Sequence, residues 1–175
     1  MTGVLVVGYG NSLRTDDGVG WHAAGLLATD PRLEGAQVLA RHQLTPELAA
    51  DISQASLVVL VDAATAGDPG SVSVRQIRPR PATPTSWSHY LDPETMAGLA
   101  ETLYGAVPPI VLVSAAASSF AEGDRLSDTL QRALPEVVEV VAGVITGQHR
   151  PEPALPPPTG GTSDHPCRKR WRAPR

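Results

Sequence analysis

Apolar residues follow two patterns along the first 146 residues of the chain. Residues 4–7 and 57–61 are continuously apolar, which is typical of strands buried on both faces of a parallel sheet. Elsewhere apolar residues recur every three or four positions, which predicts helices with one face toward a core. The two patterns predict strands at residues 4–7, 36–40, 57–61, 71–77 and 109–113, and helices at residues 17–28, 45–54, 92–103 and 126–145.

This alternation of strands and helices predicts an α/β protein. We expect a three-layer αβα sandwich around a mixed, mostly parallel, five-stranded twisted sheet. The strand at residues 57–61 should be central and should end at Asp62, because a carboxylate follows its apolar run directly. Residues 71–77 mostly alternate between polar and apolar, which favours an antiparallel strand at the sheet edge.

Three helix starts carry recognisable capping residues. Thr45 and Asp92 are each followed by proline, which is favoured at the first position of a helix. Ser127 precedes the last apolar stripe and is expected to cap that helix, which contains Pro135. In the helix after Asp92, the spacing places Leu103 on the buried face.

The composition changes at about residue 147 and divides the chain into two parts. Residues 151–175 hold seven of the 17 prolines and almost no apolar periodicity. We therefore predict an α/β domain at residues 1–146 and a proline-rich, basic and disordered tail at residues 147–175. The basic cluster at residues 168–172 favours either a solvated tail or contact with an acidic partner or RNA.

Charge and cysteine content narrow the class of protein. Residues 1–150 carry nine basic and 16 acidic side chains, whereas residues 151–175 carry five basic and two acidic ones. An acidic body argues against a nucleic-acid-binding groove in the folded part. The single Cys167 fits a reducing compartment, and neither a signal peptide nor an apolar run of ~18 residues is visible. We expect a cytoplasmic protein without a membrane segment.

A glycine-rich corner follows the first strand at residues 8–20, GYGNSLRTDDGVG. Gly8 and Gly10 match the start of a dinucleotide-binding fingerprint, but Leu13 stands at the position of its third glycine. Asp16 and Asp17 also stand where a pyrophosphate would need a helix N-terminus without negative charge. The corner is better suited to present a carboxylate to a positive group, and a nucleotide-binding domain remains a less favoured alternative.

Three polar residues lie where predicted elements end: Asp17, Asp62 and His89. Parallel strands would bring all three to the carboxyl edge of the sheet, where such folds collect their functional groups. Two carboxylates and an imidazole form an open site for nickel or zinc with free coordination positions. Each residue also has a structural alternative: the aspartates as caps of a helix or turn, and His89 as a loop histidine bonded to a carbonyl. No Gly-x-Ser-x-Gly or His-Glu-x-x-His motif is present.

The sequence resembles the hydrogenase maturation endopeptidases, which trim the C-terminal extension from the large subunit of nickel-iron hydrogenases. Residues 8–20 are similar to the opening Gly-x-Gly-Asn-x-Leu-x-x-Asp-(Asp/Glu)-Gly-x-Gly element of that family. Residues 61–63 (VDA) with 67–70 (GDPG) resemble its second element, and Ser88-His89 with Leu91 its third. The resemblance covers about residues 3–146 and leaves out the tail.

The resemblance implies that Asp17, Asp62 and His89 are both the metal-contacting and the catalytic residues, with Asp16 as a neighbouring or capping acid. It implies a nickel ion supplied by the precursor of the hydrogenase large subunit, which is the protein substrate. Cleavage would then use nickel as a Lewis acid or a carboxylate, Asp17 or Asp62, as a general base. A non-catalytic nickel-sensing maturation factor with the same three ligands is the main alternative.

Overall fold

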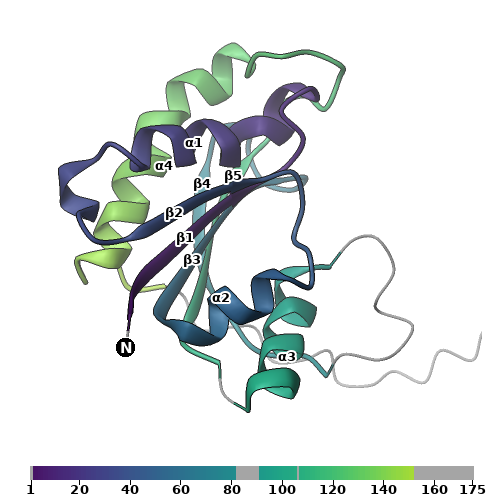
Figure 1. Cartoon of the computed structure of the whole chain (residues 1–175). Helices are drawn as coiled ribbons and strands as arrows, with labels where there is room; N and C mark the ends of the chain where they lie inside the picture. Colours follow the sequence, from purple (N-terminus) through teal and green to yellow (C-terminus); the bar gives the residue numbers. More distant parts are fainter. Residues whose placement is uncertain (1, 82–90, 106, 152–175) are drawn as a thin grey trace, which may run out of the picture.

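The computed structural model describes residues 2–81, 91–105 and 107–151, and its strands and helices alternate as the sequence pattern predicts (Figure 1). Two short 3-10 turns, Thr15–Gly18 and Pro31–Leu33, accompany these elements. The strands are β1 (Thr2–Tyr9), β2 (Gln37–Arg41), β3 (Ala55–Ala64), β4 (Val72–Ile77) and β5 (Ile110–Ala116). The helices are α1 (Val19–Leu27), α2 (Leu48–Gln54), α3 (Pro93–Tyr104) and α4 (Asp128–Ile145).

The five strands form one sheet in the order β2-β1-β3-β5-β4. The pairs β1·β2, β1·β3 and β3·β5 are parallel, and β4 runs antiparallel to β5 at the sheet edge. Because β3 lies in the middle of this order, its continuous apolar run is buried on both faces. The predicted mixed sheet, the central strand and the antiparallel edge strand are confirmed.

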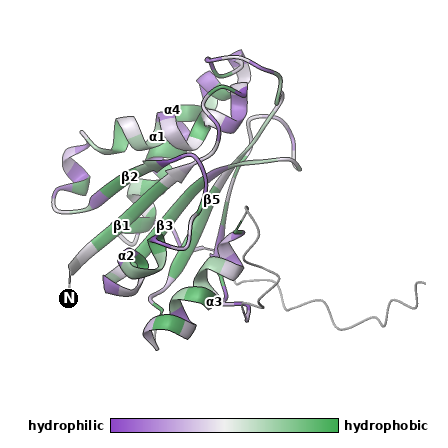
Figure 2. Ribbon diagram, turned by 45° about the vertical axis from the view of Figure 1, so that its right-hand side comes forward, coloured by the Kyte–Doolittle hydropathy of each residue, from purple (hydrophilic) through white to green (hydrophobic). Residues whose placement is uncertain are grey.

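Helices cover both faces of the sheet, which gives the expected three layers. Helices α1 and α4 pack on one face, against residues such as Val6, Val59 and Val113. Helices α2 and α3 pack on the other face, against residues such as Val7, Leu60 and Leu112. Figure 2 shows the resulting apolar interior, with the strands between the two helical layers coloured largely as hydrophobic.

Two predicted helix starts are confirmed by their capping hydrogen bonds. The Asp92 carboxylate accepts from the Thr95 N–H at 2.8 Å, and Pro93 takes the first position of α3. The Ser127 hydroxyl accepts from the Leu130 N–H at 3.2 Å at the start of α4. Among the described helices, none is both long and apolar enough to cross a membrane.

Two boundary predictions and one burial prediction are wrong. Strand β3 does not end at Asp62 but continues to Ala64, because β5 pairs with it as far as Ala116. Helix α2 begins at Leu48 rather than beside Thr45, whose carbonyl instead closes a turn with the Leu48 N–H at 3.0 Å. Leu103 is 54% exposed, because only one face of α3 meets the sheet and α2.

Candidate functional site

Glycines allow the corner between β1 and α1 to close tightly. A Cβ at Gly8 would lie 1.9 Å from the Gly20 carbonyl oxygen, and one at Gly10 would lie 1.9 Å from the Asp17 carbonyl oxygen. Gly10 also has a φ of +133°, a conformation that favours glycine. The turn that carries Asp17 therefore sits directly against the end of β1, as the sequence pattern suggests.

Asp17 occupies this corner in a way that excludes a phosphate cradle. Its Oδ2 accepts a hydrogen bond from the Asn11 backbone N–H at 3.0 Å. In a dinucleotide site, backbone N–H groups of this loop would face an anionic ligand. Here a side-chain carboxylate of the protein already uses one of them, so the corner presents negative charge.

Asp62 lies on β3, next to Tyr9 on β1. Its Oδ1 accepts from the Ala63 N–H at 2.8 Å, and its carboxyl also forms a hydrogen bond with the Tyr9 hydroxyl. Burial raises the pKa of Asp62 to about 6, and the charge of nearby Asp17 adds to the rise, although the hydrogen bonds from Tyr9 and Ala63 oppose it. Burial also raises the pKa of the Tyr9 hydroxyl, and the neighbouring Asp62 charge raises it further.

The structure brings two of the three predicted residues together. Asp17 and Asp62 are close enough for their charges to interact, and both lie at the carboxyl edge of β1 and β3. His89 lies outside the described residues. Within the described ranges, no group of three histidine, cysteine, aspartate or glutamate side chains is placed to hold a metal ion. The described part of the site is thus a pair of carboxylates.

Asp16 has a different role from the helix cap that its position suggests. Its side chain is fully buried and makes no capping bond in the Thr15–Gly18 turn. Instead its carboxylate accepts from the backbone N–H groups of Ser118, Ser119 and Ser127 at 2.8–3.0 Å. The hydroxyls of Ser118 and Ser127 donate to it at 3.1 and 2.9 Å. Burial alone would raise the pKa of Asp16, but these hydrogen bonds outweigh burial and lower it.

These contacts attach the acid-bearing turn to the loop between β5 and α4. The two loops also exchange backbone hydrogen bonds, because the Thr15 N–H donates to the Gly123 carbonyl and the Gly123 N–H to the Leu13 carbonyl, both at 3.0 Å. Thr15 has a φ of +43°, which is unfavourable for a β-branched residue and is held by this pairing. The turn that carries Asp17 is therefore held to this loop both by the side chain of Asp16 and by backbone hydrogen bonds of Leu13 and Thr15.

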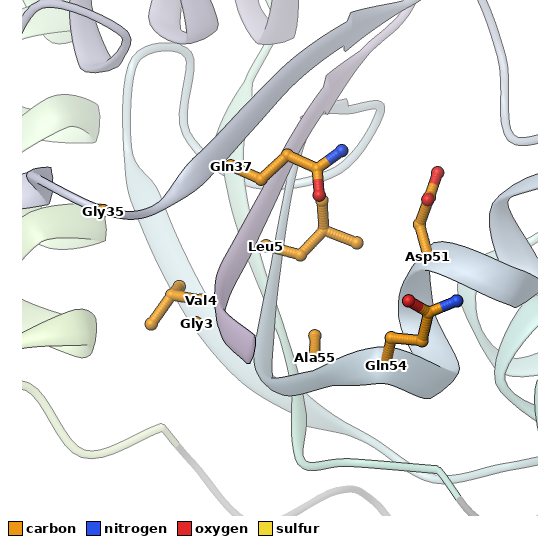
Figure 3. Close-up of a pocket in the computed structure, with 8 residues that line it drawn as sticks. All are labelled: Gly3, Val4, Leu5, Gly35, Gln37, Asp51, Gln54 and Ala55. Atoms are coloured by element: carbon orange, nitrogen blue, oxygen red, sulfur yellow. The ribbon is translucent and has the colours of Figure 1, made fainter. Parts of the chain in front are cut away.

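An open cleft of about 400 Å³ adjoins Asp62. Its other lining residues come from β1, the end of β3 and the following loop, β4, β5 and the start of α3: Tyr9, Ala63, Ala64, Thr65, Ala66, Ser73, Arg75, Pro93, Leu112 and Ser114. A second cavity of about 320 Å³ lies near the amino ends of β1, β2 and β3, with Gln37, Asp51 and Gln54 around it (Figure 3). That cavity contains none of the predicted site residues, so the cleft at Asp62 is the candidate active site.

Sequence reasoning missed the partners of both acids. Tyr9 follows Val7 by two positions on the same strand, so strand alternation places it on the α2/α3 face, where its hydroxyl meets Asp62. The three serines that bind Asp16 lie more than 100 residues further along the chain. No local pattern links them to Asp16, although the capping role of Ser127 was visible.

Comparison with solved structures gives this arrangement a context. The chain is similar to a hydrogenase 2 maturation peptidase from Thaumarchaeota archaeon SCGC_AB-539-E09, with 23% identity, a TM-score of 0.63 and coverage of 83% of this chain and 99% of that one. The fold is that of the hydrogenase maturation proteases. This chain is also similar to the [NiFe] hydrogenase maturation protease HycI from Thermococcus kodakarensis KOD1. The identity is 22% and the TM-score is 0.63, and the match covers 83% of this chain and 93% of that one.

A third protease with this fold is the hydrogenase maturating endopeptidase HybD from E. coli. It shares 22% identity with this chain at a TM-score of 0.61, and the match covers 84% of this chain and 94% of HybD. No family model matches the sequence, and a search of curated protein sequences finds no match. The resemblance to hydrogenase maturation proteases is therefore confirmed at the level of the fold.

Proposed function

We propose that this chain is an endopeptidase that removes the C-terminal extension from a nickel-loaded precursor of a NiFe-hydrogenase large subunit. The observation that carries this proposal is the meeting of Asp17 and Asp62 at the carboxyl edge of a sheet with the hydrogenase maturation protease fold. We assign the activity to residues 1–146 and place it in the cytoplasm.

In this proposal Asp17, Asp62 and His89 contact the nickel ion of the precursor. The nickel belongs to the substrate, so the site of the protease needs only part of a coordination shell. Two neighbouring carboxylates repel each other and are stabilised by a cation between them. Binding would therefore be strong only when the precursor already carries its metal, which couples cleavage to the completion of nickel insertion.

Two routes to peptide hydrolysis are compatible with these residues. Nickel can polarise the scissile carbonyl or a bound water as a Lewis acid. Alternatively, the carboxylate of Asp17 or Asp62 accepts a proton from the attacking water and returns it to the leaving amine. In both routes the hydrogen bonds from Asn11 to Asp17 and from Tyr9 and Ala63 to Asp62 hold the carboxylates in place.

The nickel dependence of cleavage tests this function. The purified protein is incubated with large-subunit precursor that is either nickel-loaded or nickel-free, and the large subunit is then weighed by intact mass spectrometry. We expect loss of the C-terminal extension only from the nickel-loaded form. Stable binding of nickel-loaded precursor without any cut would instead support the non-catalytic nickel-sensing factor.

A further inference from the structure

A row of side chains crosses four strands on the α2/α3 face of the sheet. Asp62 of β3 pairs with Ser114 of β5, and Ser114 pairs with Ser73 of β4. On the other side of Asp62 lies Tyr9, because the preceding residues Gly8 and Val61 are partners in register. Paired residues of neighbouring strands direct their side chains to the same face, so these four form one continuous line across the cleft.

Two hydroxyls in this row have hydrogen-bonding capacity that the described part of the chain does not use. The Ser73 residue is exposed and Ser114 is partly buried, and both line the cleft beside Asp62. Among the residues that the structure describes, neither hydroxyl has a hydrogen-bond partner. By contrast, Ser118 and Ser127 use their hydroxyls on Asp16. Free hydroxyls in a cleft next to an active site are available to the main chain of a bound peptide.

A guanidinium group lies beside the Ser73 end of this row, on the same strand. Arg75 follows Ser73 by two positions on β4 and therefore shares its face. Its Nη1 lies 2.6 Å from Oε1 of Glu94, in the first turn of α3, and its side chain remains 44% exposed. One contact to Glu94 leaves donors of the guanidinium for a second carboxylate. The cleft thus has a carboxylate at Asp62 and a cation at Arg75.

We propose that Ser114, Ser73 and Arg75 form the subsite for the segment on the carboxyl side of the scissile bond. The two hydroxyls bind main-chain groups of this segment, and Arg75 binds a peptide carboxylate. That carboxylate is supplied either by an acidic side chain in the extension or by its C-terminus. This subsite rests on the proposed function, because it requires that Asp62 marks the point of cleavage.

The Michaelis constant and the turnover number separate binding in this subsite from chemistry. With nickel-loaded precursor, Arg75→Ala should raise KM about tenfold with kcat within about twofold, since it removes a charge-assisted contact to substrate away from the reacting atoms. The double variant Ser73→Ala/Ser114→Ala should raise KM severalfold. Arg132→Ala is the matched control, because Arg132 is an exposed arginine on α4, on the opposite face of the sheet.

Glu94→Gln separates substrate binding from a structural effect of the ion pair. It breaks the contact with Arg75 but keeps the guanidinium, so KM should stay unchanged or fall. A rise in KM equal to that of Arg75→Ala would show that Arg75 acts only through the ion pair, and would overturn the subsite.

Two altered precursors identify the source of the carboxylate. In one, the acidic residues of the extension are replaced by their amides; in the other, the C-terminus is amidated by peptide ligation. If one altered precursor no longer distinguishes wild type from Arg75→Ala, the group altered in that precursor is the carboxylate that Arg75 binds. If wild type cuts the precursor but KM is unchanged in Arg75→Ala and in the double serine variant, the subsite is wrong and the proposed function stands. If wild type cuts no nickel-loaded precursor, both are wrong.

Discussion

The Tyr9 hydroxyl donates a hydrogen bond to the Asp62 carboxylate across the β1–β3 pair, deep in the carboxyl edge of the sheet. This bond opposes the larger effect of burial, which together with the smaller effect of the nearby Asp17 charge raises the pKa of Asp62 to about 6. The charged form of Asp62 is therefore disfavoured in the free protein. A cation bound next to its carboxylate would stabilise that form.

Replacing Asp62 by asparagine should stabilise the free protein at pH 7. The folded-state pKa is raised from 3.8 to about 6, so the native state loses stability as the pH rises through that window. Asp62→Asn removes the buried charge and should raise the free energy of unfolding by about 1–3 kcal/mol at pH 7, with the gain vanishing below about pH 4. Urea unfolding of wild type and variant at pH 7 and at pH 4 measures this difference in the free energy of unfolding. A variant less stable than wild type at pH 7 would contradict the assigned cost of the charge.

Removing the Tyr9 hydroxyl should raise the pKa of Asp62 above its value in wild type. The hydrogen bond favours the charged carboxylate, so Tyr9→Phe leaves burial and the Asp17 charge less opposed. Carboxyl ¹³C NMR titration of Asp62 measures the shift. Tyr104→Phe is the control, because Tyr104 is 51% exposed at the end of α3 and should leave the titration unchanged. A lower or unaltered Asp62 midpoint in Tyr9→Phe would show that the bond does not act on the charged form.

Replacing Asp16 by asparagine should destabilise the protein at neutral pH by about 2–4 kcal/mol. Donors reach both oxygens of this buried carboxylate, and an amide NH₂ would face at least one of them. Because the folded pKa is lowered, the stabilisation is present above the ordinary value of 3.8 and is lost as the pH falls through the lowered pKa. Thermal unfolding at pH 7 and pH 3 should therefore show a smaller difference from wild type at pH 3.

The control for Asp16 is Asp124→Asn, since Asp124 is an exposed acid in the same loop that receives the Asp16 contacts. It should change stability by less than about 0.5 kcal/mol. Equal effects of the two substitutions would mean that the five hydrogen bonds to Asp16 add nothing beyond a surface charge.

Replacing His89 by alanine should abolish cleavage without changing the melting temperature. In the proposed function His89 contacts the substrate nickel, so its loss would remove one ligand from an already incomplete shell. His42→Ala, which removes an exposed histidine after β2, should keep wild-type activity. Circular dichroism measures the melting temperature, and the intact mass of the large subunit shows whether it has been cut. Cleavage by His89→Ala at the wild-type rate would remove His89 from the site.

The sequence predicts most of the fold because its signals are local. The apolar run of β3, the alternation in β4 and the cap-plus-proline at Asp92 each act within a few residues of chain. The end of β3 was misplaced because its last residues are ordered by pairing with β5, about 50 residues away. The same limit applies to the site. Asp62 is visible as the residue that follows an apolar run, and Asp17 as part of the glycine-rich corner, whereas the serines around Asp16 are assembled only by tertiary contacts.

The nickel-loaded large-subunit precursor provides the most direct test of the central claim, that paired carboxylates at this corner act on a substrate metal. Wild type and Asp17→Ala are incubated with this precursor and with its nickel-free form under single-turnover conditions, and the large subunit is followed by intact mass spectrometry. We predict loss of the C-terminal extension in one of the four mixtures, wild type with the nickel-loaded form. Equal cutting of nickel-free precursor by wild type, or full cutting by Asp17→Ala, would contradict the account.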